Sequence, residues 1–384
     1  MGSVNLDNTG SGSAITLSSD GTSLLLDGTA IGGGGGGSPT LYAESLSGAT
    51  SPTATGTNSV AIGSDAQATA TNGSIAFGTA TRASGNANAA IGYQANAAGV
   101  GALATGYLAN AAADFSTAVG RNAKTATGSN ATALTNSYAS GANSFAAAIA
   151  NNTSTYGATG SGSVAMMNYA KASGSNSGAI GFGANATGSF AHAFGAQSFS
   201  TASSSLALGR QCQATANYAT SIGRGAINPI KGSFKFSGSY FSAAGDSQIG
   251  MYPLQIDTSD ATPVVLVTDE NSTPGAGTTN QVVLPNNSAY SFSGTIIARQ
   301  QAADGSNYAS WEIKGALLRD ANAASTVLGN GIVNKLFATA GASAWAIALT
   351  ADTTNGGLKV EATGAAATDI RWVATVNTSE VTYA

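Results

Sequence analysis

Acidic residues are the first side chains of this sequence that could carry out chemistry. Hydrolysis of a glycosidic bond needs two carboxylates that flank one sugar. The segment 56–226 contains only two acids, Asp65 and Asp114, and they are far apart in the sequence. The C-terminal part contains two close pairs in contexts rich in Ser, Thr and Pro: Asp257 with Asp260, and Asp269 with Glu270. We interpret all of these residues as loop acids or turn formers, so we expect no enzyme.

The sequence has one His and one Cys, which excludes a disulfide framework, a Cys-rich zinc site and a multi-His metal centre. His192 occupies a position that holds Val60, Ile75 and Leu206 elsewhere. A ring of such residues in a cyclic oligomer could bind an ion, but a packed or hydrogen-bonded His is the favoured interpretation. Cys212 replaces an Ala, and a buried thiol there behaves as a small hydrophobe. We expect no catalytic residue, no metal and no cofactor.

The composition restricts the class of protein further. The chain has 384 residues, of which 43% are hydrophobic and only 8% are charged, with a net charge of −4. This apolar content is too high for a disordered chain, and the acidic balance argues against nucleic acid as a partner. No stretch reaches the roughly 18 apolar residues of a membrane span. Residues 1–7 lack the basic and apolar regions of a signal peptide, so we expect neither membrane insertion nor secretion by that route.

The middle of the chain is a repeat. The pentad Ser59-Val60-Ala61-Ile62-Gly63 returns about every 14 residues, in twelve copies between residues 56 and 226. Period-2 alternation broken by Gly and Asn is typical of short strands joined by turns. Fourteen residues are too few for a unit with a helix, so we predict a coil of parallel β-structure. We predict that these residues form the structural core of the repeats: Ile62, Phe77, Ile91, Val119, Ile180, Phe194, Leu208 and Ile222.

Such a coil encloses little apolar volume, because its repeated small residue is Ala. The apolar residues that remain outside would form a long stripe along the coil. Burial of this stripe against copies of the same chain is the simplest remedy. We therefore expect a homo-oligomer with cyclic symmetry.

The units Asn58-Ser59-Val60-Ala61-Ile62-Gly63 and Ser205-Leu206-Ala207-Leu208-Gly209 resemble the head repeats of YadA-type trimeric adhesins. The resemblance covers about residues 56–226 and implies a left-handed parallel β-roll assembled as a trimer. It does not specify the function, because the same roll occurs in bacteriophage fibres. The sequence departs from the adhesin pattern at both ends, where we find no signal peptide, no stalk heptads and no membrane-anchor barrel.

Two further parts are predicted before the repeats. Residues 1–31 form a virion-attachment segment, in which Ile15-Thr16-Leu17 and Leu24-Leu25-Leu26 flank a turn as in a β-hairpin. Residues 32–55 contain six consecutive glycines, Gly32 to Gly37, and form a flexible linker. A phosphate-binding loop is excluded, because no Gly-Lys-Ser/Thr accompanies the glycines.

Residues 227–384 are predicted to form an antiparallel β-sandwich or jelly-roll tip. Strand-like runs between turn clusters are Pro263–Thr268, Gln281–Leu284, Tyr290–Arg299, Tyr308–Leu318, Trp345–Leu349 and Ile370–Asn377. Trp311, Trp345 and Trp372 fall in these runs or at their ends and are expected in the core, although one exposed Trp or Tyr could stack on a sugar. Three runs are similar to the C-terminal domains of phage and prophage fibre proteins: Gly245-Asp246-Ser247-Gln248, Leu284-Pro285-Asn286-Asn287-Ser288 and Ile370-Arg371-Trp372-Val373-Ala374.

The sequence therefore predicts a structural and adhesive protein, a homotrimeric phage tail fibre located in the virion. Its N-terminal segment would bind other virion proteins of the tail, baseplate or capsid. A host-binding site for a surface glycan or protein would lie beyond residue 230. The alternatives are a capsid-mounted head or decoration fibre and a bacterial trimeric adhesin at the cell surface. A depolymerase tailspike is disfavoured by the missing pair of carboxylates.

Overall fold

The computed structural model describes residues 50–150, 154–269, 280–301 and 307–383, together with the backbone of four short strands near the N-terminus. The chain divides into two compact units, Met1–Asn136 and Ser137–Ala384, and each is described by itself. The helical segments among the described residues are two short 3-10 turns, Ala323–Ser325 and Ala340–Ala342. The all-β class predicted from the sequence is confirmed. In the part of the chain described, no helix has the length and apolar character needed to cross a membrane.

The first unit begins with a small antiparallel sheet, in the order β1 (Val4–Leu6), β2 (Ile15–Ser19), β3 (Leu24–Leu26) and β4 (Thr29–Ala30). Strand β2 pairs with β3, with Leu17 opposite Leu26. The hairpin predicted for the N-terminal segment is confirmed. Residues 32–49 of the predicted linker lie outside the described residues, whereas its end, Thr53–Ala54, forms β5 and already belongs to the solenoid.

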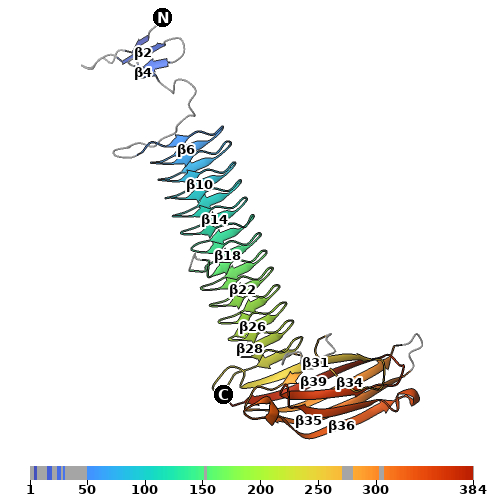
Figure 1. Ribbon diagram of the computed structural model, residues 1–384. Helices are drawn as coiled ribbons and strands as arrows, with labels where there is room; N and C mark the ends of the chain where they lie inside the picture. The colour runs from blue at the N-terminus through green and yellow to red at the C-terminus, as the bar shows by residue number, and fades with distance from the viewer. Residues whose placement is uncertain are drawn as a thin grey trace. The chain divides into compact units, whose positions relative to one another are not determined.

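The rest of the first unit consists of six turns of a parallel β-solenoid. Each turn contributes a three-residue strand and a two-residue strand, which pair in parallel with the corresponding strands of the next turn (Figure 1). The three-residue strands are β6 (Val60–Ile62), β8 (Ile75–Phe77), β10 (Ala89–Ile91), β12 (Leu103–Thr105), β14 (Thr117–Val119) and β16 (Thr132–Leu134). The two-residue strands are β5 (Thr53–Ala54), β7 (Gln67–Ala68), β9 (Arg82–Ala83), β11 (Asn96–Ala97), β13 (Asn110–Ala111) and β15 (Lys124–Thr125).

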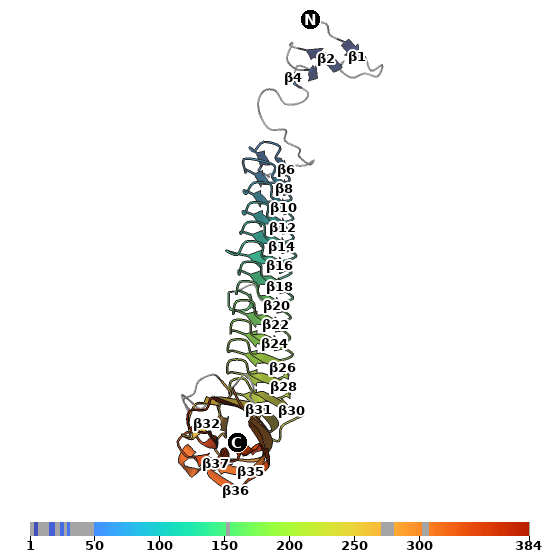
Figure 2. The same cartoon turned by 90° about the vertical axis from the view of Figure 1, so that its right-hand side faces the viewer.

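The second unit begins with seven turns of the same kind, whose strands stack in the same parallel order (Figure 2). Its larger strands are β18 (Phe145–Ala147), β20 (Val164–Met166), β22 (Gly178–Ile180), β24 (His192–Phe194), β26 (Leu206–Arg210), β28 (Thr220–Arg224) and β30 (Phe234–Ser237). Its two-residue strands are β17 (Tyr138–Ala139), β19 (Gly157–Ala158), β21 (Lys171–Ala172), β23 (Asn185–Ala186), β25 (Phe199–Ser200), β27 (Gln213–Ala214) and β29 (Ile227–Asn228).

The solenoid therefore has one turn more than the twelve predicted. Strands β29 and β30 form this turn, and β30 continues to Ser237. The pentad count missed it because Phe234-Lys235-Phe236 has lysine where the other turns have a small residue. The predicted parallel coil is confirmed, and its left-handedness stays a prediction.

One turn is longer than the others without any loss of register. Phe145 pairs with Val164 although 19 residues separate them, whereas 14 separate Val164 from its next partner, Gly178. The additional residues lie between β18 and β19, because β19 pairs normally with β21. Residues from Gly157 onward belong to the regular turn.

The pentad glycines permit close stacking of successive turns. A Cβ added to Gly78 would lie 2.0 Å from the carbonyl oxygen of Gly92 in the next turn, and the φ of Gly78 is +125°. A side chain would therefore meet both a backbone clash and an unfavourable conformation at this position. Most turns accordingly end the pentad with glycine, and three that do not have Thr135, Ala148 or Met167 there with a positive φ.

The interior of the solenoid is lined by small side chains, and this corrects our prediction of its core. Ala61, Ala76 and Ala90, the central residues of three successive pentads, have no exposed surface. The larger neighbours on each strand point outward, because the narrow coil leaves no room for them inside. The predicted core residues Phe77, Ile91, Ile180 and Leu208 are exposed, and Ile62, Val119, Phe194 and Ile222 are half-buried.

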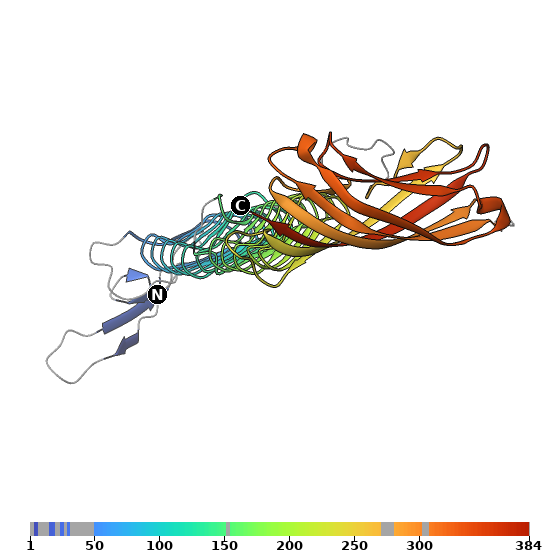
Figure 3. The same cartoon turned by 90° about the horizontal axis from the view of Figure 1, so that it is seen from below.

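The C-terminal domain of the second unit contains two antiparallel sheets (Figure 3). The larger sheet has the order β31 (Ser247–Thr258), β39 (Ile370–Thr382), β34 (Ser288–Gln300), β35 (Tyr308–Arg319) and β36 (Val327–Ala338). In the smaller sheet, β38 (Gly357–Thr363) pairs with β32 (Val264–Val265), β33 (Val282–Val283) and β37 (Ala346–Asp352). The predicted strands are present, and β31, β36 and β38 are additional. The sandwich or jelly-roll classification stays a prediction.

Three tryptophans form the centre of this domain's core. The Trp372 ring lies 5.4 Å from that of Trp311 and 5.9 Å from that of Trp345, and each is 1% exposed. The predicted core role of all three is confirmed. The predicted alternation along β39 is also confirmed, because Ile370, Trp372, Ala374 and Val376 are all buried.

Candidate functional site

Parallel pairing places equivalent outward residues of successive turns in a continuous row, which we call the outward ladder. In the first unit the ladder consists of Ile62, Phe77, Ile91, Thr105, Val119 and Leu134. In the second unit it consists of Ala147, Met166, Ile180, Phe194, Leu208, Ile222 and Phe236. Strands of one sheet are about 4.8 Å apart, so neighbouring ladder side chains lie close to one another.

The ladder is unusually apolar for a surface. Phe77 is 51% exposed, Ile91 36% and Leu208 42% in the single chain. A second outward row, which includes Ile75 and Leu103, is also exposed. Contiguous apolar surface of this kind marks an interaction site. The ladder can therefore bind another apolar surface.

In the second unit the ladder continues onto the C-terminal domain. Strand β30 pairs with β31, which places the last ladder residue, Phe236, opposite Ile249. The same face of the large sheet then presents an apolar hollow of 510 Å³. Its walls include Leu318, Val327 and Val381, each about half exposed. Solenoid and domain thus share one apolar face in this unit.

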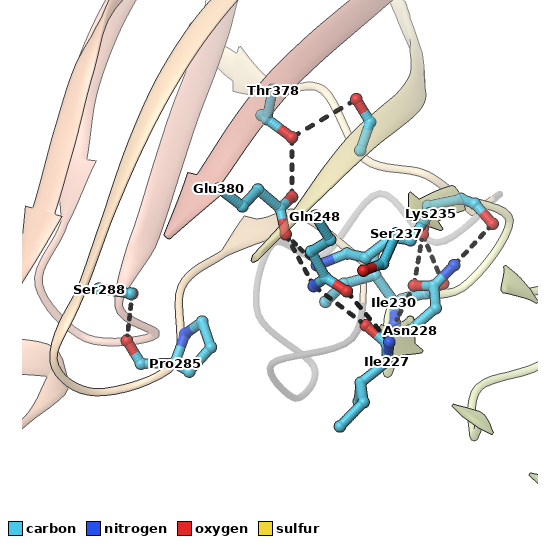
Figure 4. A network of polar contacts seen from close by, with 12 residues as sticks. Ile227, Asn228, Ile230, Lys235, Ser237, Gln248, Pro285, Ser288, Thr378 and Glu380 are labelled. Atoms are coloured by element: carbon cyan, nitrogen blue, oxygen red, sulfur yellow. Dashed lines mark hydrogen bonds and ion pairs between the residues drawn. The ribbon is translucent and has the colours of Figure 1, made fainter. Parts of the chain in front are cut away.

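A buried ion pair joins the last solenoid turn to the C-terminal domain (Figure 4). Lys235 on β30 and Glu380 on β39 are 2.8 Å apart, and their side chains are 2% and 0% exposed. Gln248 donates to the same Glu380 oxygen at 2.9 Å, while Tyr252 and Thr378 each donate to the other oxygen at 2.7 Å. The carboxylate is fully hydrogen-bonded, so its role is structural.

The charges of this network shift the pKa values within it. Burial alone would raise the pKa of Glu380, but the Lys235 charge and the hydrogen bonds outweigh burial and lower the pKa below its ordinary value of 4.5. Burial and the Glu380 charge raise the pKa of Tyr252 well above its ordinary value. Glu380 is therefore held as a carboxylate and Tyr252 as a neutral donor.

Sequence reasoning missed this network, although two signals pointed to it. Lys235 occupies the interior position of a pentad, where Ala207 and Ser221 occur in preceding turns. A lysine that points into such a core needs a buried carboxylate. The period-2 pattern of β39, extended beyond Val376, places Glu380 on the buried face.

The structure separates the single His from the single Cys. His192 is exposed on β24, and its ring stacks against Phe194 with 5.8 Å between ring centres. Cys212 is buried, as predicted, and its thiol donates to the Gly223 carbonyl oxygen at 3.1 Å. Burial raises the pKa of this thiol, which disfavours the reactive thiolate. The described residues contain no group of three or more His, Cys, Asp or Glu suited to hold a metal ion.

The two acids of the solenoid have local structural contacts. Asp65 lies 3.6 Å from the Arg82 guanidinium and accepts a hydrogen bond from Gln67. Asp114 accepts one from the backbone N–H of Val100 at 2.8 Å. These contacts link adjacent turns and adjacent strands, and the structure does not bring the two carboxylates together.

The acids of the C-terminal domain also have separate contacts. Asp260 accepts a hydrogen bond from the backbone N–H of Thr262 at 2.7 Å, which is a turn contact. Asp257 lies 3.7 Å from Arg371, and Asp269 lies 3.1 Å from Lys231. Glu270, the predicted neighbour of Asp269, lies outside the described residues. Asp257 and Asp269 border one surface hollow without forming a hydrogen-bonded pair.

A family model described as the YadA head domain repeat matches residues 54–81, 89–109, 97–123 and 200–226. Among solved structures, the tailspike protein of Acinetobacter phage vB_ApiP_P1 is similar, at 10% identity and a TM-score of 0.18 over 86% of this chain and 80% of that protein. No curated protein matches the chain. The segments that match the family model all lie in the part of the chain that forms the parallel β-solenoid.

Proposed function

We propose that this chain is the subunit of a homotrimeric fibre that a bacteriophage carries on its virion and that adheres to the host. The observation that carries the proposal is the outward ladder, an apolar row that one chain leaves exposed. In an oligomer with closed cyclic symmetry, the apolar row of every subunit is covered by a neighbouring subunit. The similarity to YadA head repeats supports three copies.

The virion role is supported by the three C-terminal runs that resemble phage fibre domains, and two of them lie beside the junction of solenoid and domain. Asp246 of the first run accepts hydrogen bonds from the backbone N–H groups of Phe241, Ser242 and Ala243. Ser288 of the second run donates to the Pro285 carbonyl oxygen. Gly245 and Gln248 of the first run also hydrogen-bond to the backbone of Gly225 and Ile227 in the solenoid, so we infer that this run fixes the attachment of the domain to the shaft. Residues 1–31 would then bind a neighbouring virion protein.

The fibre is proposed to act without catalysis. The acids that could hydrolyse a glycan have structural contacts, and Glu380 has no free lone pair for proton transfer. Host binding would lie in the C-terminal domain, because loops on a scaffold vary more freely than a repeated turn. A bacterial trimeric surface adhesin is the second candidate, favoured by the adhesin-type repeats.

The trimer is tested by Ile91→Asp in the full chain. The residue is 36% exposed in one chain, so the variant should fold, but a charge in the subunit interface should prevent assembly. Sedimentation velocity at micromolar concentration should give a trimer for the wild type and a monomer for the variant. Phe115→Asp is the matched control, since Phe115 is 62% exposed and lies off the ladder. A wild-type monomer would refute the trimer, and a trimeric Ile91→Asp would refute the ladder as its interface.

The place of the fibre is tested by immunogold labelling of virions and of bacterial surfaces. Label on tail structures supports the tail fibre, and label on capsids supports the head fibre. Label on uninfected bacteria favours the adhesin and contradicts the virion role.

A further inference from the structure

A hollow of 430 Å³ lies between the last solenoid turn and the C-terminal domain. The solenoid contributes Ile227 and Ile230 to its wall, and the domain contributes Val283, Leu284 and Pro285. These walls are apolar, and the volume falls within the usual range of small-molecule sites, about 300–1,000 Å³. The hollow can therefore enclose the apolar part of a ligand.

Two polar side chains of the same wall have a buried atom without a hydrogen-bond partner among the described residues. These atoms are Nε of Arg319 and Oγ1 of Thr382. Buried polar atoms in folded proteins are normally hydrogen-bonded. The Arg319 Nε–H can only donate a hydrogen bond, and the Thr382 hydroxyl can donate one as well. Both therefore suit a ligand that presents acceptor oxygens.

The backbone holds the Arg319 side chain in place. Its guanidinium donates a hydrogen bond to the Leu284 carbonyl oxygen. Gly356 packs against it, because a Cβ added to Gly356 would lie 2.2 Å from Nη1 of Arg319. The φ of Gly356 is +79°, a conformation that glycine adopts more readily than other residues. The cation is therefore positioned before a ligand binds, which lowers the entropic cost of binding.

The charges around the hollow leave Arg319 available for an anion. Among the described residues Arg319 forms no ion pair. The charge of Lys235, which also lines the hollow, is compensated by Glu380. The acid among the described lining residues is Asp246, and it accepts hydrogen bonds from three backbone N–H groups of its own loop. A planar guanidinium pairs best with a carboxylate.

The hollow lies on the face of the large sheet opposite to the face that continues the outward ladder. Side chains alternate between the two faces along a strand. Arg319 is therefore on the face opposite to Leu318, its exposed neighbour on β35. Thr382 is likewise opposite to Val381, its exposed neighbour on β39. Burial of the ladder face in an oligomer thus does not fill the hollow.

We propose that this hollow binds a small carboxylate that carries an apolar chain, such as a medium-chain fatty acid. The carboxylate accepts hydrogen bonds from Arg319 and Thr382, and the chain packs between Ile230 and Leu284. Because the ligand contacts both the solenoid and the domain, its binding stabilises their junction. This site goes beyond the proposed adhesive function and does not depend on it.

The test is isothermal titration calorimetry of the full-length protein with sodium octanoate. Acetate has the same head group without the chain, and octanol has the chain without the charge. Wild-type protein should bind octanoate about tenfold or more tightly than octanol, since the hydrogen bonds to a charged group are lost with octanol. Acetate at the same concentrations should not bind measurably. Octanoate should also raise the midpoint of thermal unfolding.

Two variants locate the site. Arg319→Gln should weaken octanoate binding about tenfold or more, and its unchanged affinity for octanol would show that the hollow is intact. Thr382→Val keeps the shape of the side chain and should weaken octanoate binding about threefold. Arg371→Gln is the matched control, because Arg371 is a 69% exposed cation of the same sheet and lies outside the lining of the hollow. Its octanoate affinity should equal that of the wild type.

A wild-type protein that does not bind octanoate would overturn the site. Equal affinities for octanoate and octanol would overturn the carboxylate as the recognised group. An equal loss of octanoate binding in Arg371→Gln and Arg319→Gln would mean nonspecific attraction of an anion and would overturn the site as well. If Arg319→Gln also loses octanol, Thr382→Val decides, and full octanoate binding by that variant would refute the proposal.

Discussion

The solenoid and the C-terminal domain solve the problem of a core in opposite ways. Inside the solenoid the buried residues are mainly Ala and Ser, and most of the large apolar residues point out. Inside the domain the buried residues include all three tryptophans, although its outer face also carries exposed apolar residues such as Leu318 and Val381. The domain thus has a core of large apolar side chains, whereas the solenoid buries mainly small side chains and leaves large apolar ones exposed. Two all-β regions of one chain can therefore have cores of very different side-chain size.

Trp372→Ala should have the largest effect on stability, and it tests whether the core of the C-terminal domain is independent of the solenoid. The substitution removes the ring that contacts both other tryptophans and the hydrogen bond to Thr258. Loss of a buried Trp costs about 3–5 kcal/mol. In guanidinium chloride, tryptophan fluorescence, which reports only the C-terminal domain, should shift to a lower midpoint. Circular dichroism of the solenoid should keep its own midpoint; if both signals move together, the two regions unfold as one.

Glu380→Gln should have the next largest effect, because it acts at the junction of the two regions. The substitution leaves the buried Lys235 charge without its partner, and such a break costs about 3 kcal/mol. The double variant Lys235→Met with Glu380→Gln should recover most of this loss, since neither charge remains and the amide oxygen can still accept a hydrogen bond from Tyr252. If the single variant is as stable as the wild type, the ion pair does not hold the domain to the shaft.

The same carboxylate gives a pH dependence. The pKa of Glu380 is lowered in the folded chain from its ordinary value of 4.5, so its contribution is present above about pH 4.5 and is lost as pH falls through the folded pKa. Thermal unfolding scans should show this loss in the wild type below pH 4.5. Glu380→Gln should lack that part of the acid dependence.

The smallest of these effects is expected from Ala104→Leu inside the solenoid. Ala104 has no exposed surface, and overpacking a filled core costs about 1–3 kcal/mol. Thr105→Leu, the next residue on β12, is the matched control because it points outward on the ladder, where other turns carry Ile or Leu. It should leave folding unchanged and strengthen the trimer. If Thr105→Leu lowered the free energy of unfolding more than Ala104→Leu did, residue 105 would lie inside the solenoid and residue 104 outside, contrary to the structure.

The period and alternation of the sequence were sufficient to predict the parallel turns, the N-terminal hairpin and the buried tryptophans. They were insufficient to tell which face of each three-residue strand is inside, because Ile62 and Ala61 are both apolar. Only the width of the coil, which depends on backbone approach at residues such as Gly78, excludes the larger side chain. The sequence did not predict the thirteenth turn, because its interior residue is Lys235 in place of a small residue. The partner that makes this buried lysine possible, Glu380, lies 145 residues away in the sequence.

The long turn between β18 and β19 shows how such a protein can change over evolutionary time. Since Phe145 and Val164 keep their pairing across the additional residues, the chain can acquire new loop sequence at one corner while neighbouring turns stay as they are. Deletion or duplication of a whole turn, by contrast, would alter the length of the solenoid by about 4.8 Å. The length of the solenoid and the sequence of its loops can therefore change independently. We expect that a peptide inserted between β18 and β19 would leave the pairing of the neighbouring turns unchanged.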